Sequence, residues 1–201
     1  NCFANVADTI TPSIINPHST VSDVADTSFT PDRSTALSIL NRMDTTVQSP
    51  WWPHVPPGKL YQNIKENILY PNKLYQGILT NFCGYAAFTN YMIRIKPALY
   101  VQLMLDLYTN GNAVCHKTTL HPTEPVRNAA GTLHAKGILD IHYADQLLFL
   151  SLADHFKSYI NLLNRHYDPG DEDLIWAATT FGKFKRMMKK MLNVKLKALG
   201  S

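Results

Sequence analysis

The sequence has little of what marks a membrane, disulfide-linked or cofactor-dependent protein. No run of the chain approaches the roughly 18 apolar residues of a transmembrane helix, so we expect no membrane span. Its three cysteines are too few and too irregularly spaced for a disulfide framework. It contains no phosphate-binding loop and no dinucleotide-binding glycine fingerprint. We therefore expect chemistry without a cofactor.

A metal site is not indicated either. Cys115, His116 and His121 are close in sequence, but no second Cys or His pair stands at zinc-site spacing. The acidic run formed by Asp168 and residues 171–173 lacks the alternating ligand spacing of a calcium loop. The sequence thus predicts no bound metal.

What the chain does have is the balance of a globular protein and a basic C-terminal segment. Of its 201 residues, 45% are hydrophobic and 17% charged, which is typical of one domain with an extension. Seven of the nineteen basic side chains fall between Lys183 and Lys197, leaving twelve basic against fifteen acidic residues elsewhere. Since the chain begins at Asn1 and shows no basic-then-apolar leader, we interpret it as a processed or cut segment.

Residues 1–58 are predicted to form an irregular extension rich in Ser, Thr and Pro. Residues 1–50 contain fifteen Ser or Thr and little apolar periodicity, apart from one short helix expected over residues 31–43. Residues 49–58 include four prolines, which exclude a regular helix, together with Trp51 and Trp52. We expect this strap to cover the core with both tryptophans, although an exposed recognition patch is an alternative.

Residues 59–201 are predicted to form the domain, which one interpretation takes as truncated. Helices are expected over residues 59–67, 83–95, 97–110 and 143–165, and a last helix is capped by Thr179-Thr180 and runs to about 192. Residues 114–133 are predicted to form irregular or short extended structure. The fold class is therefore mainly α, or α+β.

One cysteine stands where a nucleophile is expected. Cys83 begins an apolar helix just after a Gln-Gly turn, and the N–H groups and positive dipole end of a helix N-terminus stabilise a thiolate. The same groups can hold an oxyanion. The alternative is that Cys83 is simply a small buried apolar residue.

The residues around Cys83 resemble a papain-like cysteine peptidase domain found among bacterial secreted and contact-delivered toxins. The similarity spans roughly residues 59–192. It lies in the segments KLYQG at 73–77, NFCGYAAF at 81–88, DLYTNG at 106–111, ADQLLFLSLAD at 144–154 and TTFGKF at 179–184. The resemblance implies the helical lobe of a papain-like fold, with Cys83 as the nucleophile.

Three other residues are candidates for the same site. Gln76 lies seven residues before Cys83, close to the spacing of the oxyanion-hole glutamine in papain-like enzymes, but can equally be a turn residue. Asn81 can serve the same role or cap the helix. His155 is the histidine to test first as a general base, because its long helix is expected to pack near the Cys83 helix; an ordinary surface histidine is the alternative.

The chain departs from the family pattern in two places. Tyr85 stands where family members usually have proline. The family also has a histidine next to a tryptophan on a strand well downstream of the last helix, and this sequence reaches Ser201 without one. Cysteine peptidase chemistry needs an imidazole to move the proton, so the general base has no matching position.

The resemblance implies a toxin or effector, secreted or delivered into a target cell, that acts as a cysteine protease or a related amide or acyl-transfer enzyme. Its partners would be a protein substrate in the target cell and an immunity protein. Two alternatives stay open: a non-catalytic interaction domain or fragment of such a toxin, and a basic helical module that binds a membrane or nucleic acid through the segment from Lys183 to Lys197.

Overall fold

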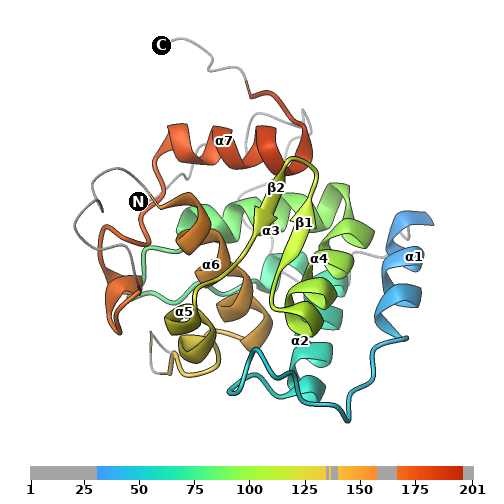
Figure 1. Ribbon diagram of the computed structural model, residues 1–201. Coiled ribbons are helices and arrows are strands. Elements are labelled where there is room, and N and C mark those ends of the chain that lie inside the picture. The colour runs from blue at the N-terminus through green and yellow to red at the C-terminus, as the bar shows by residue number, and fades with distance from the viewer. Residues whose placement is uncertain (1–30, 135, 137–139, 158–166, 197–201) are drawn as a thin grey trace, which may run out of the picture.

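The structure is a computed structural model and describes residues 31–134, 136, 140–157 and 167–196 (Figure 1). Its described part is mainly helical with one small antiparallel sheet, as the sequence predicts. The elements are α1 (Pro31–Leu40), α2 (Pro57–Leu69), the 3₁₀ helix η1 (Pro71–Lys73), α3 (Cys83–Ile95), α4 (Pro97–Asn110), β1 (Ala113–Cys115), β2 (Thr118–Leu120), α5 (Glu124–Ala129), α6 (Tyr143–Phe156), the 3₁₀ helix η3 (Asp171–Asp173) and α7 (Phe181–Leu192).

Helix α6 lies at the centre of the fold. Nearly all of its side chains are buried, because α2, α3, α5 and β2 contact it on different sides. A helix that is apolar all round needs such enclosure. The sequence predicts a central helix here that runs to residue 165. The helix ends at Phe156, and residues 158–166 lie outside the described part of the chain.

Helices α3 and α4 form the hairpin that the sequence predicts, with the expected bounds. Pro97 is the first residue of α4, where its missing N–H leaves no hydrogen bond unmade. Gly111 ends α4 in the left-handed conformation, with φ of 70°, and its N–H donates to the Leu107 carbonyl at 2.9 Å.

The strap of residues 49–58 closes the core over α4, but only one of its two tryptophans is buried. Trp52 is fully buried and its indole N–H donates to the Leu107 carbonyl at 2.7 Å. Trp51 is 41% exposed, so the expectation that both tryptophans are buried is wrong for this one. It lies over the backbone of Gly111 and contacts the Arg127 guanidinium.

Helix α1 also belongs to the packed body. It contacts α4 and α2, and Ala36 and Leu40 are fully buried. The part of the predicted extension from residue 31 onward therefore shares one core with the helices that follow residue 59.

The segment predicted as irregular or short extended between residues 114 and 133 contains most of a hairpin of short strands, as the second alternative has it, and the short helix α5, which was not predicted. In the hairpin Cys115 pairs with Thr118, and His116 takes a positive φ of 51° at the turn. The buried Cys115 thiol donates to the Met191 carbonyl at 3.3 Å, which fixes the hairpin against α7. None of the described helices combines the length and the apolar character that a transmembrane span needs.

Candidate functional site

Cys83 is the first residue of α3, and its side chain is half-buried. The Phe82 carbonyl accepts hydrogen bonds from the N–H groups of Tyr85 and Ala86, both at 2.9 Å. The N–H of Gly84 has no hydrogen-bond partner among the described residues, as is usual in the first turn of a helix. The start of α3 thus presents a thiol beside an available backbone donor.

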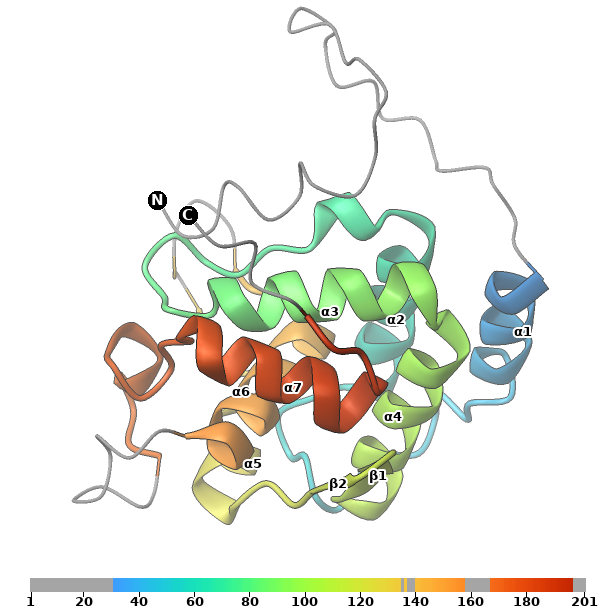
Figure 2. The ribbon, with the colours of Figure 1, turned by 90° about the horizontal axis from the view of Figure 1, so that it is seen from above.

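A second helix begins next to the first one. Figure 2 shows α3 and α7 side by side, with their N-terminal ends at the same end of the molecule. Gly84 makes this approach possible, because a Cβ atom there would lie 2.4 Å from the Cβ of Thr179. Thr180 caps α7 by accepting from the Lys183 N–H at 3.2 Å, as the sequence predicts. Both positive dipole ends therefore face the region of Cys83.

Lys183 adds a buried ammonium group to this region. Its side chain is almost fully buried, and the ammonium donates to the Ala178 carbonyl and to the Tyr85 hydroxyl at 3.3 Å. Burial, with a smaller contribution from Arg186, lowers the pKa of Lys183 to about 8. The positive end of the helix dipole also repels a cation in the first turn. Burial and the dipole therefore both disfavour the charged form of Lys183.

The sequence reasoning missed Lys183, although a signal was present. Lys183 stands four residues before Met187, on the buried face of α7, whereas Lys185 and Lys189 fall on the outer face. A lysine in register with an apolar stripe is a candidate for a buried charge. Lys183 belongs to a C-terminal segment in which most lysines are solvated, and this composition hides its buried position.

Tyr85 connects the lysine to the cysteine. It is fully buried, packs edge-on against Phe82 at 6.2 Å between ring centroids, and receives the Lys183 hydrogen bond. Burial raises the pKa of Tyr85, and the charge of a Cys83 thiolate raises it further. Tyr85 is thus close to both the thiol and the ammonium.

Asn81 does not cap α3. Phe82 occupies the N-cap position and makes no side-chain cap. The Asn81 side-chain amide instead donates to the carbonyls of Asp173 and Leu174 at 2.9 and 3.0 Å, and its backbone N–H donates to the Glu172 carbonyl at 2.9 Å. Asn81 therefore ties the loop before α3 to η3 and to the residue that follows it.

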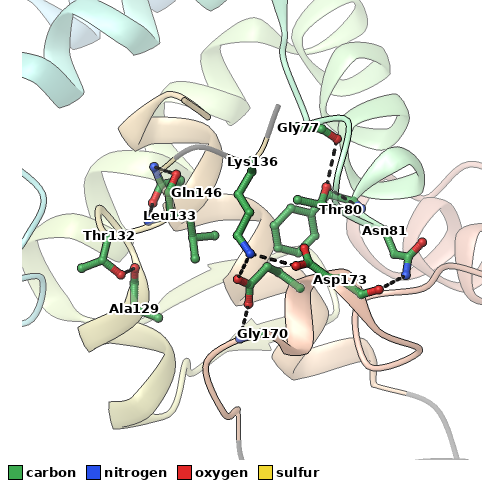
Figure 3. A network of polar contacts seen from close by, with 12 residues as sticks. Gly77, Thr80, Asn81, Ala129, Thr132, Leu133, Lys136, Gln146, Gly170 and Asp173 are labelled. Atoms are coloured by element: carbon green, nitrogen blue, oxygen red, sulfur yellow. Dashed lines mark hydrogen bonds and ion pairs between the residues drawn. The ribbon is translucent and has the colours of Figure 1, made fainter. Parts of the chain in front are cut away.

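Lys136 strengthens the same connection. Its ammonium lies 2.8 Å from a Glu172 oxygen and 2.9 Å from an Asp173 oxygen (Figure 3). Its carbonyl accepts from the Leu79 N–H at 3.2 Å. Burial acts to raise the pKa of Glu172, but hydrogen bonds from Lys136 and Tyr167 outweigh it and hold that pKa below its usual value. These contacts fix the position of the chain that leads into Cys83.

Gln76 is part of the turn before that loop. Its carbonyl accepts from the Thr80 hydroxyl at 2.6 Å, and Gly77 follows with a φ of 82°. Among the described residues, nothing hydrogen-bonds to the Gln76 side chain. The oxyanion role and the turn role both stay compatible with this half-buried position.

His155 lies elsewhere. It is the last residue but one of α6, and its ring lies 4.6 Å from the Phe156 ring between centroids. Partial burial, followed by the charge of Lys190, lowers its pKa. Lys190 stands seven residues beyond Lys183 on α7, about 10 Å along the helix. The structure thus brings the Cys83 turn of α3 to the beginning of α7, holds Gln76 in the turn that leads to it, and places His155 beside the second half of α7.

Within the described residues, no cluster of three or more His, Cys, Asp or Glu side chains is arranged to hold a metal ion. Comparisons with protein-family models, with curated proteins and with solved structures find no match to this chain. Function must therefore be argued from the site itself.

Proposed function

We propose that the chain acts through Cys83 as a nucleophile in an amide-bond hydrolysis or related acyl-transfer reaction. The observation that carries this proposal is the half-buried thiol at the start of α3, set beside the start of α7 and the buried Lys183. Two helix N-termini and one ammonium favour the thiolate over the neutral thiol, and the thiolate is the reactive form of cysteine.

The first step would be attack of the Cys83 thiolate on a carbonyl carbon. A carbon–sulfur bond forms while the carbonyl π electrons move to oxygen, and the Gly84 N–H is a donor for that oxyanion. When the intermediate collapses, the carbon–nitrogen bond breaks and the leaving amine takes up a proton. Water then hydrolyses the thioester, releasing a carboxylic acid and the thiol.

Lys183 is a candidate source of the proton for the leaving amine. An acid with a pKa of about 8 is still mostly protonated at neutral pH and can give up its proton readily. It donates to the Tyr85 hydroxyl, and Tyr85 is near enough to Cys83 for a thiolate charge there to raise the pKa of Tyr85. His155 stays a prediction for the general base, and its place beside Lys190 makes it the weaker candidate of the two.

The resemblance to papain-like toxin domains supports the biological part of the proposal. A toxin or effector delivered into a target cell, with a protein substrate and an immunity protein as partners, fits a cysteine peptidase of this kind. The runner-up is a non-catalytic interaction domain, which the position of His155 away from the start of α3 favours.

Thiol reactivity tests the chemistry directly. Iodoacetamide labelling is followed residue by residue against pH, with Cys115 as the internal control, since burial raises the pKa of Cys115 to about 11. We expect Cys83 to be labelled faster than Cys115, with an inflection below the ordinary thiol pKa of about 8.5.

Hydrolysis of a mixed peptide library, with and without Cys83→Ser, tests turnover. A Cys83 labelling inflection below the ordinary thiol pKa, without peptide cleavage that depends on the Cys83 thiol, favours the non-catalytic interaction domain. Slower labelling of Cys83 than of Cys115 would end the nucleophile proposal.

A further inference from the structure

Large apolar side chains are exposed around the beginnings of α3 and α7. Five of the nine exposed large hydrophobic residues in the described part of the chain lie in the segments that lead into these helices or begin them. They are Ile78 (66% exposed), Leu79 (59%), Leu174 (59%), Ile175 (58%) and Phe181 (39%). A monomeric protein rarely gathers exposed aliphatic groups in this way without a binding role.

These five residues lie at one end of the molecule, which we call the apolar end. Asn81 joins the loop that carries Ile78 and Leu79 to η3 through two hydrogen bonds and to Leu174, the residue after η3, through a third. Both loops lie at the same end of the molecule in Figure 2, where α7 begins with Phe181. The ion pairs of Lys136 with Glu172 and Asp173 fix the backbone between these loops. The exposed apolar side chains are therefore carried by an ordered backbone.

A basic stripe continues from the apolar end along α7. Phe181, Lys185 and Lys189 follow at intervals of four residues on one face, and the Lys185 ammonium lies 5.3 Å from the centre of the Phe181 ring. Arg186 and Lys190 flank this stripe and are exposed. Among the residues that the structure describes, no carboxylate forms an ion pair with any of these four cations.

We infer that the apolar end and the basic stripe together dock on an anionic lipid surface. Aliphatic side chains on loop tips can enter the interfacial region of a bilayer, while the neighbouring cations are attracted to anionic headgroups. Nucleic acid would satisfy the cations but leave the aliphatic groups in water. The apolar stripe of α7 cannot be the inserting surface, because Phe184, Met187, Met188 and Met191 are buried.

Docking in this orientation brings the start of α3 to the lipid surface. Asn81 and Cys83 follow directly on Leu79, so the thiol would face substrates that are themselves at the membrane. The inference concerns binding and does not depend on the chemistry proposed for Cys83.

Co-sedimentation of the full chain with vesicles tests the inference. Vesicles of phosphatidylcholine mixed with phosphatidylserine should retain the protein, and vesicles of phosphatidylcholine alone should retain it much less. Raising the salt concentration should weaken binding. The double variant Arg186→Gln, Lys189→Gln should lose about 30-fold in apparent affinity, since each basic residue near an anionic surface contributes about fivefold.

Matched variants assign the apolar contribution. Leu174→Ser with Ile175→Ser should reduce vesicle binding strongly while thermal stability stays unchanged, because both side chains are exposed. Val47→Ser, at an equally exposed position over the α1–α4 side, and Lys65→Gln on α2 should bind as the original chain does. Equal binding to both kinds of vesicle, binding to an oligonucleotide but not to vesicles, or an equal loss in Val47→Ser would overturn the inference.

Discussion

The end of the molecule where α3 and α7 begin differs from the side covered by the strap. Under the strap, polar groups are buried in matched pairs: the Trp52 indole donates to Leu107, and the Tyr108 hydroxyl donates to the Val55 carbonyl at 3.0 Å. At the beginnings of α3 and α7, an ammonium is buried and aliphatic groups are exposed. Both features cost stability, and natural proteins retain such costs mainly at functional sites.

The contrast depends on α7 being firmly packed, and Met188→Asp tests this with the largest expected effect. Met188 is 1% exposed, so the substitution buries an unpaired carboxylate or expels the helix. We expect the free energy of unfolding to fall by more than about 4 kcal/mol. Lys189→Asp, at the next and exposed position, should change it by less than about 1 kcal/mol. Similar melting temperatures for the two variants would show that α7 is not part of the core.

The strap is tested by Trp52→Ala. Removing a fully buried indole leaves a cavity and takes away one of the two donors to the Leu107 carbonyl, which should cost about 3–5 kcal/mol in denaturant unfolding. Trp51→Ala should cost less, about 1 kcal/mol, because that ring is 41% exposed. Equal costs at the two positions would remove the distinction between the buried and the exposed tryptophan.

Local signals in the sequence predict the helices well. Pro97, Gly111 and the Thr180 cap each act within one turn of chain, and the bounds of α3, α4 and the start of α7 follow from them. Where β1 and β2 form, the sequence predicts only irregular or short extended structure. The packing of this hairpin on α7 joins Cys115 to Met191, 76 residues apart, and no local pattern predicts that contact.

The site was only partly predictable for the same reason. The position of Cys83 depends on a helix start, which is local, and was found. The contacts of Asn81 with Leu174 span 93 residues and those of Lys183 with Tyr85 span 98, so no spacing rule reveals them. The burial of Lys183 is signalled by its register with the apolar stripe of α7, but its partner Tyr85 and the solvent exposure of Ile175 depend on which helix ends meet.

A buried carboxyl group, away from both regions, makes stability depend on pH. Asp145 on α6 is fully buried and accepts from the Asn67 side-chain amide at 2.8 Å; burial raises its pKa from 3.8 to about 7. Because the pKa is raised in the folded state, protonated Asp145 adds to the free energy of unfolding. This contribution is fully present below the pKa of 3.8 of the unfolded chain and is lost as the pH rises through the folded-state pKa of about 7. The upper limit of this contribution is on the order of 4 kcal/mol.

Asp145→Asn removes that titration while keeping the shape of the protonated carboxyl. Urea unfolding between about pH 4 and about pH 8 should show a falling stability for the original chain and a flatter profile for the variant. The variant should be the more stable of the two at about pH 8, by roughly 2–4 kcal/mol. Parallel profiles would mean that the Asp145 carboxyl titrates normally inside the fold.

The smallest expected effect on stability, and the sharpest test of the contrast, comes from Lys183→Met. Methionine fills a similar volume without a buried charge, so the free energy of unfolding should change by about 1 kcal/mol or less, although the Ala178 carbonyl loses its donor. The Cys83 labelling inflection should nevertheless move to higher pH, because the thiolate loses a nearby positive charge.

Lys185→Met, on the outer face of the same helix turn, removes one charge as well and should leave the inflection almost unchanged, since water screens it. If both variants shift the inflection equally, only net charge matters, and the buried ammonium has no special relation to the thiol. If neither shifts it, the cost of burying Lys183 must be explained by packing of α7 against Tyr85 instead of by the chemistry of Cys83.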